Sequence, residues 1–153
     1  RIIKRWLVVY INKILSISDN LDRNKWKENL PTSTFNGFQT KNIISLFPKE
    51  LINEILFFND FNQKLFHLHF IEYNKGGFQK IHNHEKAEEH SFILYLNTCD
   101  GDTCFGHPLN IKFEPIKGRL VVFSSDLWHY ALKNWKDNKK VLVGGIGKKE
   151  WLT

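Results

Sequence analysis

Hydrophobic and polar residues follow two different patterns along the 153-residue chain. The first third reads as helical and irregular. The segment 48–61, PKELINEILFFNDF, has a proline in its first turn and apolar residues at helical spacing, so it predicts a helix. The basic segment 1–15, RIIKRWLVVYINKIL, is a second candidate for an amphipathic helix. The polar stretch 19–37, DNLDRNKWKENLPTSTFNG, predicts a surface loop.

From residue 65 onward the pattern changes to short strands rich in β-branched and aromatic residues, separated by Gly, Asn, Asp and Pro. These segments are KLFHLHFIEY, GFQKIHN, HSFILYLN, NIKFEP, GRLVVFS, LWHYAL and KVLVGGIG. Such strands after N-terminal helices predict a mainly β fold of the α+β class, an antiparallel jelly roll or barrel. We expect residues 1–47 to form helical or irregular support and residues 48–153 to form the jelly-roll domain, within one compact unit.

Composition and charge exclude several classes of protein. Hydrophobic residues make up 42% of the chain, which allows a packed core and argues against disorder. No apolar run approaches the ~20 residues of a membrane span, and no secretory cleavage site follows WLVVYI. The net charge of +6 could attract nucleic acid, but most basic residues are scattered lysines. We therefore expect a cytoplasmic protein with no membrane or nucleic-acid partner. The absence of methionine indicates a processed chain or part of a longer protein.

Several common sources of chemistry are missing from the sequence. It contains no Walker or Rossmann glycine-rich loop and no Gly-x-Ser-x-Gly nucleophile elbow. Two cysteines, Cys99 and Cys104, flank the turn DGDT. They could form a disulfide in an oxidising compartment or remain free thiols in the cytosol. The histidines are therefore the remaining candidates for a catalytic or metal site.

Two His-x-His pairs stand out among the seven histidines. His82 and His84 lie at the end of a short strand, and side chains two apart in a strand share one face. Strand ends at a barrel mouth commonly present ligands. The other pair, His67 and His69, lies within an apolar strand, and we interpret it as hydrogen-bonded histidines of the sheet. His129 begins a later strand, about 45 residues on, which is typical of non-haem iron sites built from two histidines and a carboxylate.

Three segments around these histidines occur in the order found in a known family. YNKGGFQKIHNH is similar to Tyr-x-x-Gly-x-x-Tyr-x-x-His-x-Asp, and YLNTCDGDTCF to Tyr-Leu-Asn followed by an acidic Gly-rich turn and Thr-x-Phe. PIKGRLVVFSSDLWH resembles Pro-x-x-Gly-x-[Ala/Leu]-[Val/Leu]-x-Phe before a distal histidine. Over residues 48–147 the chain thus resembles the iron(II)- and 2-oxoglutarate-dependent dioxygenases, and specifically their prolyl 4-hydroxylase-like branch. The matched positions are Tyr73, Gly76, His82, Tyr95, Leu96, Asn97, Thr103, Phe105, Pro115, Gly118, Phe123 and His129.

This resemblance implies a double-stranded β-helix, a cupin-like jelly-roll barrel. It also implies Fe²⁺, the co-substrate 2-oxoglutarate, and O₂, with hydroxylation of a C–H bond and release of succinate and CO₂. The substrate could be peptidyl proline or another side chain, a nucleobase or a small metabolite. The implied catalytic metal ligands are His82, His84 and His129. Tyr95 and either Lys139 or Lys140 would bind the distal carboxylate of 2-oxoglutarate; strand alternation lets one of these lysines face inward, and the sequence leaves open which.

Two residues depart from the family pattern. His84 stands where the family has Asp, and Gln79 where it usually has Tyr. Three-histidine iron sites occur in related cupin dioxygenases, so His84 could be a ligand; alternatively Glu85 could complete the site. With ordinary imidazole pKa values near 6.5, a three-histidine site should lose metal below about pH 6.

The departure at His84 leaves other functions open. One alternative is a catalytically degenerate jelly-roll module that binds metal or a partner. Another is a three-histidine dioxygenase that acts without 2-oxoglutarate. Trp128 and Trp135 could line the substrate mouth or pack in the core.

Overall fold

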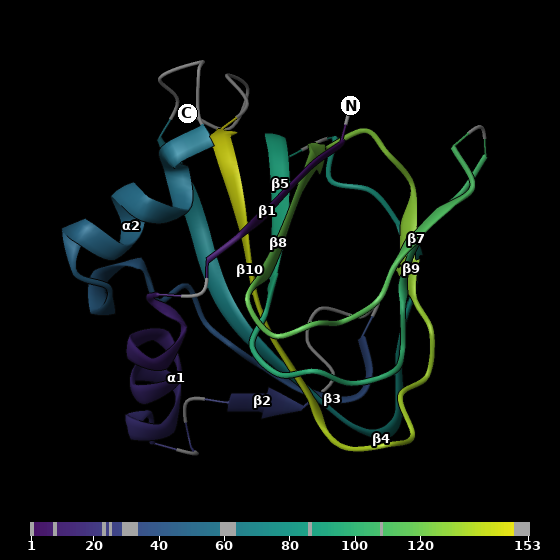
Figure 1. The fold of residues 1–153 in the computed structure, drawn as a ribbon, viewed down its shortest axis with the longest axis horizontal. Coiled ribbons are helices and arrows are strands. Elements are labelled where there is room, and N and C mark those ends of the chain that lie inside the picture. Colours follow the sequence, from purple (N-terminus) through teal and green to yellow (C-terminus); the bar gives the residue numbers. More distant parts are fainter. Residues whose placement is uncertain are drawn as a thin grey trace.

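The computed structural model describes residues 2–7, 9–22, 24, 26–28, 34–58, 64–85, 87–107 and 109–148. This part is mostly β, with a strongly curled antiparallel sheet and two α-helices on one side of it (Figure 1). In chain order the elements are β1 (Ile2–Trp6), α1 (Ile11–Asn20), β2 (Trp26–Glu28), β3 (Thr34–Thr40), the 3₁₀ helix η2 (Ile44–Leu46), α2 (Lys49–Ile55), the 3₁₀ helix η3 (Leu56–Phe58), β4 (Leu65–His82), β5 (Glu88–Tyr95), β6 (Thr103–Phe105), β7 (Ile111–Phe113), β8 (Arg119–Ser124), β9 (His129–Ala131) and β10 (Lys139–Lys148).

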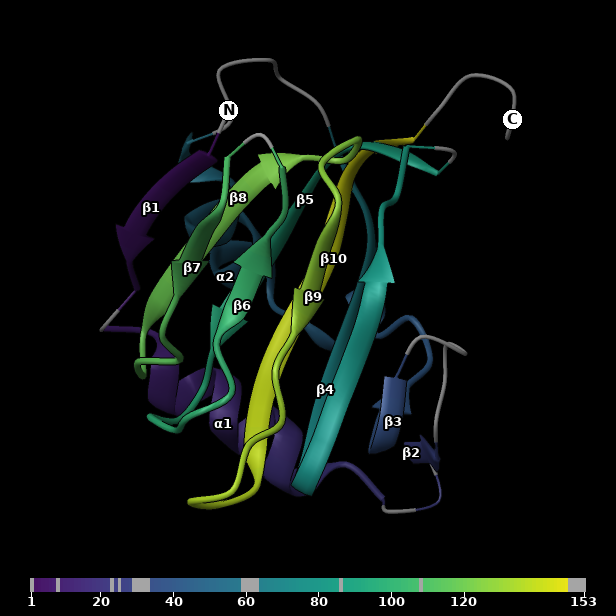
Figure 2. The ribbon, with the colours of Figure 1, turned by 90° about the vertical axis from the view of Figure 1, so that its right-hand side faces the viewer.

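The sheet curls into a half-barrel because strand β4 belongs to both of its halves. The strand order is β1-β8-β5-β10-β4-β9-β6-β7, with β3 also paired to β4 and β2 to β3. The first half of β4 pairs with β10, and its end pairs with β9 through His82 and His129. Between the halves, Gly76 adopts φ +84° and its N–H donates to the carbonyl of Asn134 at 2.6 Å. The long strand bends there, so both of its ends reach the same end of the barrel (Figures 1 and 2).

Strand alternation gives the central strands two apolar faces and the protein two cores. One face packs against the helices, and its buried residues include Leu68, Phe70, Leu94, Leu120 and Leu142 from strands with Ile11, Ile14, Leu51 and Ile55 from helices. The other face lines the inside of the barrel with Ile71, Tyr73, Ile93, Tyr95, Val121, Phe123 and Val141. Of two adjacent residues on one strand, one therefore faces the helices and the other faces the inside of the barrel. This alternation decides which side chains can reach the site.

The N-terminal third differs from the sequence prediction. Residues Ile2–Trp6 form strand β1, which pairs along the edge strand β8, and the first helix begins only at Ile11. The prediction of one helix over residues 1–15 was therefore wrong, because pairing with an open sheet edge satisfies the backbone groups of this segment. Part of the predicted loop forms β2 and β3.

The predicted helix at 48–61 is confirmed from Lys49 to Ile55 and continues as η3. Its last three residues lie outside the described part. None of the helices described here is both long and apolar enough to cross a membrane.

Candidate active site

Three of the predicted residues meet at the mouth of the half-barrel. His82 ends β4, His84 lies in the turn that follows, and His129 begins β9 opposite His82. One ligand atom from each lies within 4.8 Å of those of the other two. The ring centroids are 4.3 Å apart for His82 and His129, 4.8 Å for His82 and His84, and 5.2 Å for His84 and His129. A single metal ion with bonds of about 2 Å to nitrogen can be held by such a group.

Backbone hydrogen bonds orient two of these rings. Nδ1 of His82 lies 2.7 Å from the carbonyl oxygen of Lys80, and Nδ1 of His129 lies 3.1 Å from that of Leu127. A carbonyl only accepts, so in the neutral ring the proton sits on Nδ1 and Nε2 keeps its lone pair. This arrangement is typical of metal-ligating histidines, whose second nitrogen is fixed by an outer hydrogen bond.

Burial keeps the three imidazoles in the neutral form that binds metal. Loss of hydration lowers the pKa of His129 to about 3 and that of His84 to about 4, and also lowers the pKa of His82. These values lie below the ordinary 6.5 on which the sequence-based expectation of metal loss near pH 6 rested. We therefore expect proton competition to begin at lower pH than the sequence alone suggests.

The same shifts predict how the stability of the metal-free protein depends on pH. Between pH 6.5 and about 4, the unfolded chain takes up protons that His84 and His129 of the folded protein do not. Stability is therefore expected to fall as the pH falls through this range. Each imidazole that stays neutral should lower the free energy of unfolding by about 1.4 kcal/mol per pH unit. Urea unfolding at several pH values measures the slope.

A His129→Asn variant provides the comparison for this measurement. Since it lacks one of the two groups, its stability should fall less steeply with decreasing pH than that of the parent protein. Equal slopes would mean that His129 is protonated as easily in the folded protein as in the unfolded chain.

The remaining histidine pair lines the same cavity but does not join the group of three. Nδ1 of His69 lies 2.9 Å from the carbonyl oxygen of Thr40, and Nε2 of His67 lies 2.5 Å from a carboxylate oxygen of Glu88. Their interpretation as hydrogen-bonded histidines of the sheet is confirmed. Glu85, the alternative to His84 as a metal ligand, is exposed and lies outside the group of three histidines.

The two candidate lysines lie in opposite environments. Lys139 is 1% exposed, donates to the carbonyl of Gly101 at 2.7 Å, and places its ammonium 4.6 Å from the centre of the Tyr73 ring. Within the described residues no carboxylate forms an ion pair with it. Burial lowers the pKa of Lys139 to about 8. Lys140 faces outward and pairs with Asp19 and Glu72 at 3.5 and 3.7 Å.

Tyr95 and Lys139 share a small cavity inside the barrel. Its volume is about 20 Å³, and Tyr73, Gln79 and Thr103 also line it. The Tyr95 hydroxyl, which is buried, donates to Oγ1 of Thr103 at 2.6 Å. Burial raises the pKa of Tyr95, so the phenol stays protonated and can act as a hydrogen-bond donor.

A larger cavity of about 190 Å³ lies next to this one, on the side of the histidines. It is lined by His82, His84 and His129, and it shares Gln79, Ile93 and Val143 with the small cavity. The barrel thus contains three neutral imidazoles toward the mouth and a buried ammonium deeper inside, with apolar walls between them. This donor set fits a divalent metal at the first position and an anion at the second.

Other predicted residues lie outside this cavity. Trp128 and Trp135 are 53% and 61% exposed, so packing in the core is excluded for both. Trp135 lines an open groove of about 720 Å³ together with Phe78 and Lys133. Cys99 and Cys104 are free thiols.

Sequence analysis missed one buried carboxylate in the cavity wall. Glu88 is 1% exposed and bonds to both His67 and Ser91. The inward positions of β5 are Ser91, Ile93 and Tyr95, so regular alternation does not place the side chain of residue 88 on this face. The available signal was a pair of acidic residues at the start of a strand whose first half is polar and whose second half is apolar.

No protein-family model matches the sequence, and no curated protein matches it. Solved structures do match. A prolyl-4-hydroxylase from Pseudomonas putida is 16% identical, with a TM-score of 0.77 over 97% of this chain and 92% of that one. A prolyl hydroxylase from Trichoplax adhaerens, in complex with a hypoxia inducible factor peptide fragment, is 13% identical, with a TM-score of 0.70 over 95% and 82%. HygX from Streptomyces hygroscopicus, with nickel, 2-oxoglutarate and hygromycin B bound, is 9% identical, with a TM-score of 0.72 over 97% and 83%.

At these identities the likeness establishes the fold. The chain has the architecture of solved prolyl hydroxylases and related oxygenases, a mainly β, curled antiparallel sheet consistent with a jelly roll. The mainly β fold class predicted from the sequence is confirmed.

Proposed function

We propose that the protein is a non-haem iron, 2-oxoglutarate-dependent dioxygenase that hydroxylates a C–H bond, and that its curled sheet is a double-stranded β-helix. The observation that carries this proposal is the placement of three neutral histidines and one buried ammonium, which forms no ion pair with any carboxylate of the described residues, along neighbouring cavities of the barrel. The likeness in fold to solved 2-oxoglutarate oxygenases supports the same conclusion.

His82, His84 and His129 would hold Fe²⁺ on one side of the ion. When bound, iron together with O₂ and 2-oxoglutarate supplies the oxidising power for hydroxylation, and 2-oxoglutarate leaves as succinate and CO₂. The protein's part is to keep the rings neutral and oriented, through burial and the carbonyl groups of Lys80 and Leu127. The apolar walls around Ile93 and Phe123 limit the access of water to the reacting groups.

Lys139 and Tyr95 would bind the distal carboxylate of 2-oxoglutarate. A buried ammonium without a carboxylate partner is costly, and an anionic ligand offsets that cost through charge-assisted hydrogen bonds. The phenol of Tyr95 can add a second donor to the same group. Lys140 is left out of this proposal because its ion pairs lie on the outer face of the strand.

The substrate would be a peptide or a small molecule. Both kinds occur among the similar structures, one with a peptide fragment and one with hygromycin B. The exposed aromatic ring of Trp135 and the open groove beside it offer a contact surface outside the cavity, which supports this reading.

A second candidate function is a metal-binding module without catalysis. The specific observation in its favour is His84, which stands where the resembled family has a carboxylate and leaves a site of three neutral ligands. The two functions differ in one measurable respect. The module would bind iron without forming succinate from 2-oxoglutarate.

A series at position 84 tests the role of His84 and separates these functions. His84→Ala should weaken iron binding about 10-fold or more, because one coordinating nitrogen is removed. His84→Asp should retain iron, since a carboxylate replaces the imidazole. Iron content and iron-dependent succinate formation are measured for the parent and both variants. If His84→Ala equals the parent in both measurements, His84 is not a ligand, and if the parent binds iron but forms no succinate, the protein is the module.

A further inference from the structure

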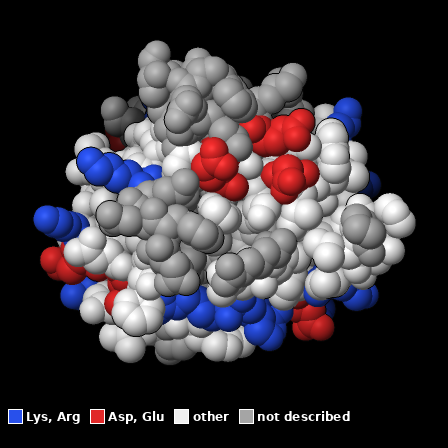
Figure 3. Space-filling model, turned by 90° about the horizontal axis from the view of Figure 1, so that it is seen from above, with Lys and Arg blue, Asp and Glu red and all other residues white. Residues whose placement is uncertain are grey.

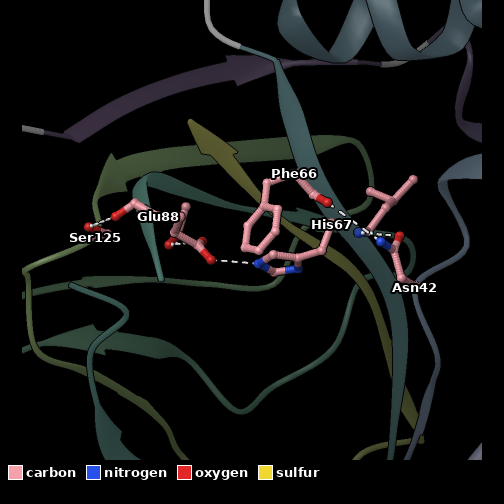
Figure 4. A network of polar contacts seen from close by, with 7 residues as sticks. Asn42, Phe66, His67, Glu88 and Ser125 are labelled. Atoms are coloured by element: carbon pink, nitrogen blue, oxygen red, sulfur yellow. Dashed lines mark hydrogen bonds and ion pairs between the residues drawn. The ribbon is translucent and has the colours of Figure 1, made fainter. Parts of the chain in front are cut away.

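A carboxylate bridges three strands on the cavity wall formed by β4, β10 and β5. Glu88 Oε1 lies 2.5 Å from Nε2 of His67 on β4, and Glu88 Oε2 accepts a hydrogen bond of 2.6 Å from Ser91 on β5 (Figure 4). In the register of the sheet, Gly145 of β10 lies directly between His67 and Ser91. A Cβ at Gly145 would overlap the Glu88 carboxyl group. The glycine therefore leaves the space in which the carboxylate crosses from one strand to the other.

Further hydrogen bonds hold the backbone on both sides of this carboxylate and its histidine partner. The Ser125 hydroxyl donates to the backbone carbonyl of Glu88, and the Asn42 side chain accepts from the N–H of Leu68 and donates to the carbonyl of Phe66, on either side of His67 (Figure 4). These contacts fix the backbone at both ends of the Glu88–His67 pair.

Two buried hydrogen-bond acceptors that line the same cavity, one of them on the Glu88–His67 pair itself, have no partner in the described part of the chain. Nδ1 of His67 and Oε1 of Gln39 are both buried and unbonded within the described structure. In the neutral ring the proton of His67 lies on Nε2, facing Glu88, so Nδ1 presents a lone pair. Both residues line the cavity that also contains His82, His84 and His129. With the His67 ring neutral, the cavity thus presents a carboxylate and two unused acceptors, from β5, β4 and β3, next to the three histidines.

Acidic side chains also lie near the mouth of the cavity, so the charge there has the same sign as the Glu88 carboxylate. Glu85 and Asp126 are exposed and lie in the turns that follow His84 and Ser125. Figure 3 views the molecule from above Figure 1 and shows acidic side chains gathered on part of this face, with lysine and arginine around its edges. A protein of net charge +6 thus places acidic groups beside its cavity.

We propose that the cavity lined by Glu88, His67 and Gln39 contains a recognition site for a protonated amine of the substrate. A carboxylate and unused acceptors lining one cavity match a group that carries positive charge and several N–H donors, and an ammonium has both. The wall and the three histidines line one cavity, so an amine held there would leave a neighbouring C–H bond of the same molecule facing the histidines. The identification of this amine as part of the substrate rests on the proposed function.

Two probes of equal length test the site without any turnover. The metal-free protein is titrated at pH 7 with n-butylammonium chloride and, separately, with n-butanol, and backbone amide shifts are followed by NMR. The ammonium should bind at least about 10-fold more tightly than the alcohol, as expected for one charge-assisted hydrogen bond. The shifts should centre on Gly144 and Gly145. Equal binding of the two probes would mean that Glu88 serves only as a bridge between strands.

Three variants test which side chain is responsible for the preference for the ammonium. Glu88→Gln should abolish the preference for the ammonium, whereas Glu89→Gln, the neighbouring acid that does not line the cavity, should leave it unchanged. Since Glu88 is buried and its replacement could disturb folding, Gln39→Glu provides an independent test in the opposite direction. The added carboxylate should tighten ammonium binding several-fold, and unchanged binding in this variant would overturn the proposal.

The test of the amine site is independent of the test of the dioxygenase activity, because the titration contains no iron, 2-oxoglutarate or O₂. Ammonium preference without succinate formation would support the amine site and reject the dioxygenase. Succinate formation without ammonium preference would reject the amine site alone.

Discussion

Replacing His129 with alanine is expected to remove iron binding, with an affinity loss of about 100-fold or more. A four-ligand metal site binds with roughly 10–16 kcal/mol, so one ligand accounts for about 3 kcal/mol, which corresponds to a factor of about 100. His129 is 2% exposed and is the most buried of the three histidines, so no exposed side chain can easily take its place. Iron content after dialysis and a calorimetric titration with Fe²⁺ under anaerobic conditions measure the loss.

The matched control for this experiment is His69→Ala. His69 is also a cavity histidine, but its Nδ1 is engaged by the carbonyl of Thr40 and it lies outside the group of three. This variant should retain iron. A loss of iron from both variants to the same degree would point to damage of the fold and not to a lost ligand, and iron retention by His129→Ala would refute the metal site.

Replacing Lys139 with methionine is expected to raise the concentration of 2-oxoglutarate required for half-maximal turnover by about 10- to 150-fold. Methionine keeps much of the volume but removes the charge, and a hydrogen bond to a charged group contributes about 1.5–3 kcal/mol. Lys139 is buried and forms no ion pair within the part of the chain that the structure describes, so neither solvent nor a neighbouring charge there can replace the lost ammonium. The measurement is the dependence of succinate formation on 2-oxoglutarate concentration.

The adjacent residue provides the control, since Lys140→Met removes the same charge from the outer face of the same strand. Its 2-oxoglutarate requirement should equal that of the parent protein. A second readout uses the lowered pKa of about 8 for Lys139. Above pH 8 the free enzyme loses the ammonium proton, so its affinity for 2-oxoglutarate should fall with rising pH. Lys139→Met should lack this dependence, and equal behaviour of the two methionine variants would exclude Lys139 as the anion site.

The candidate site could be predicted where sequence spacing alone fixes geometry. This applies to His82 and His84, which are two residues apart at a strand end. The third ligand, His129, followed from the family resemblance, and the structure shows that the strand it begins pairs with that end. The choice between Lys139 and Lys140 could not be made in this way. Alternation requires that one of them points inward, but which one depends on the register of β10 against β4 and β5.

The N-terminal segment is a second feature that the sequence pattern did not predict correctly. Residues 2–6 have a sequence compatible with an amphipathic helix, yet they form β1 because the edge of β8 is available for pairing. The edge strand is about 115 residues away in sequence, and local propensity carries no information on its position.

Short-range patterns of the sequence determined the strands from residue 65 onward, the helix at α2 and the pairing of His82 with His84 on one face. These features follow from side-chain periodicity and from local chemistry, which neighbouring residues fix among themselves. Only the tertiary structure decided that three histidines share one point with lowered pKa values, that Lys139 is the buried lysine, and that Glu88 crosses Gly145 to reach His67. Those properties depend on burial and on strand register between distant segments, and both arise only when the sheet closes around the cavity.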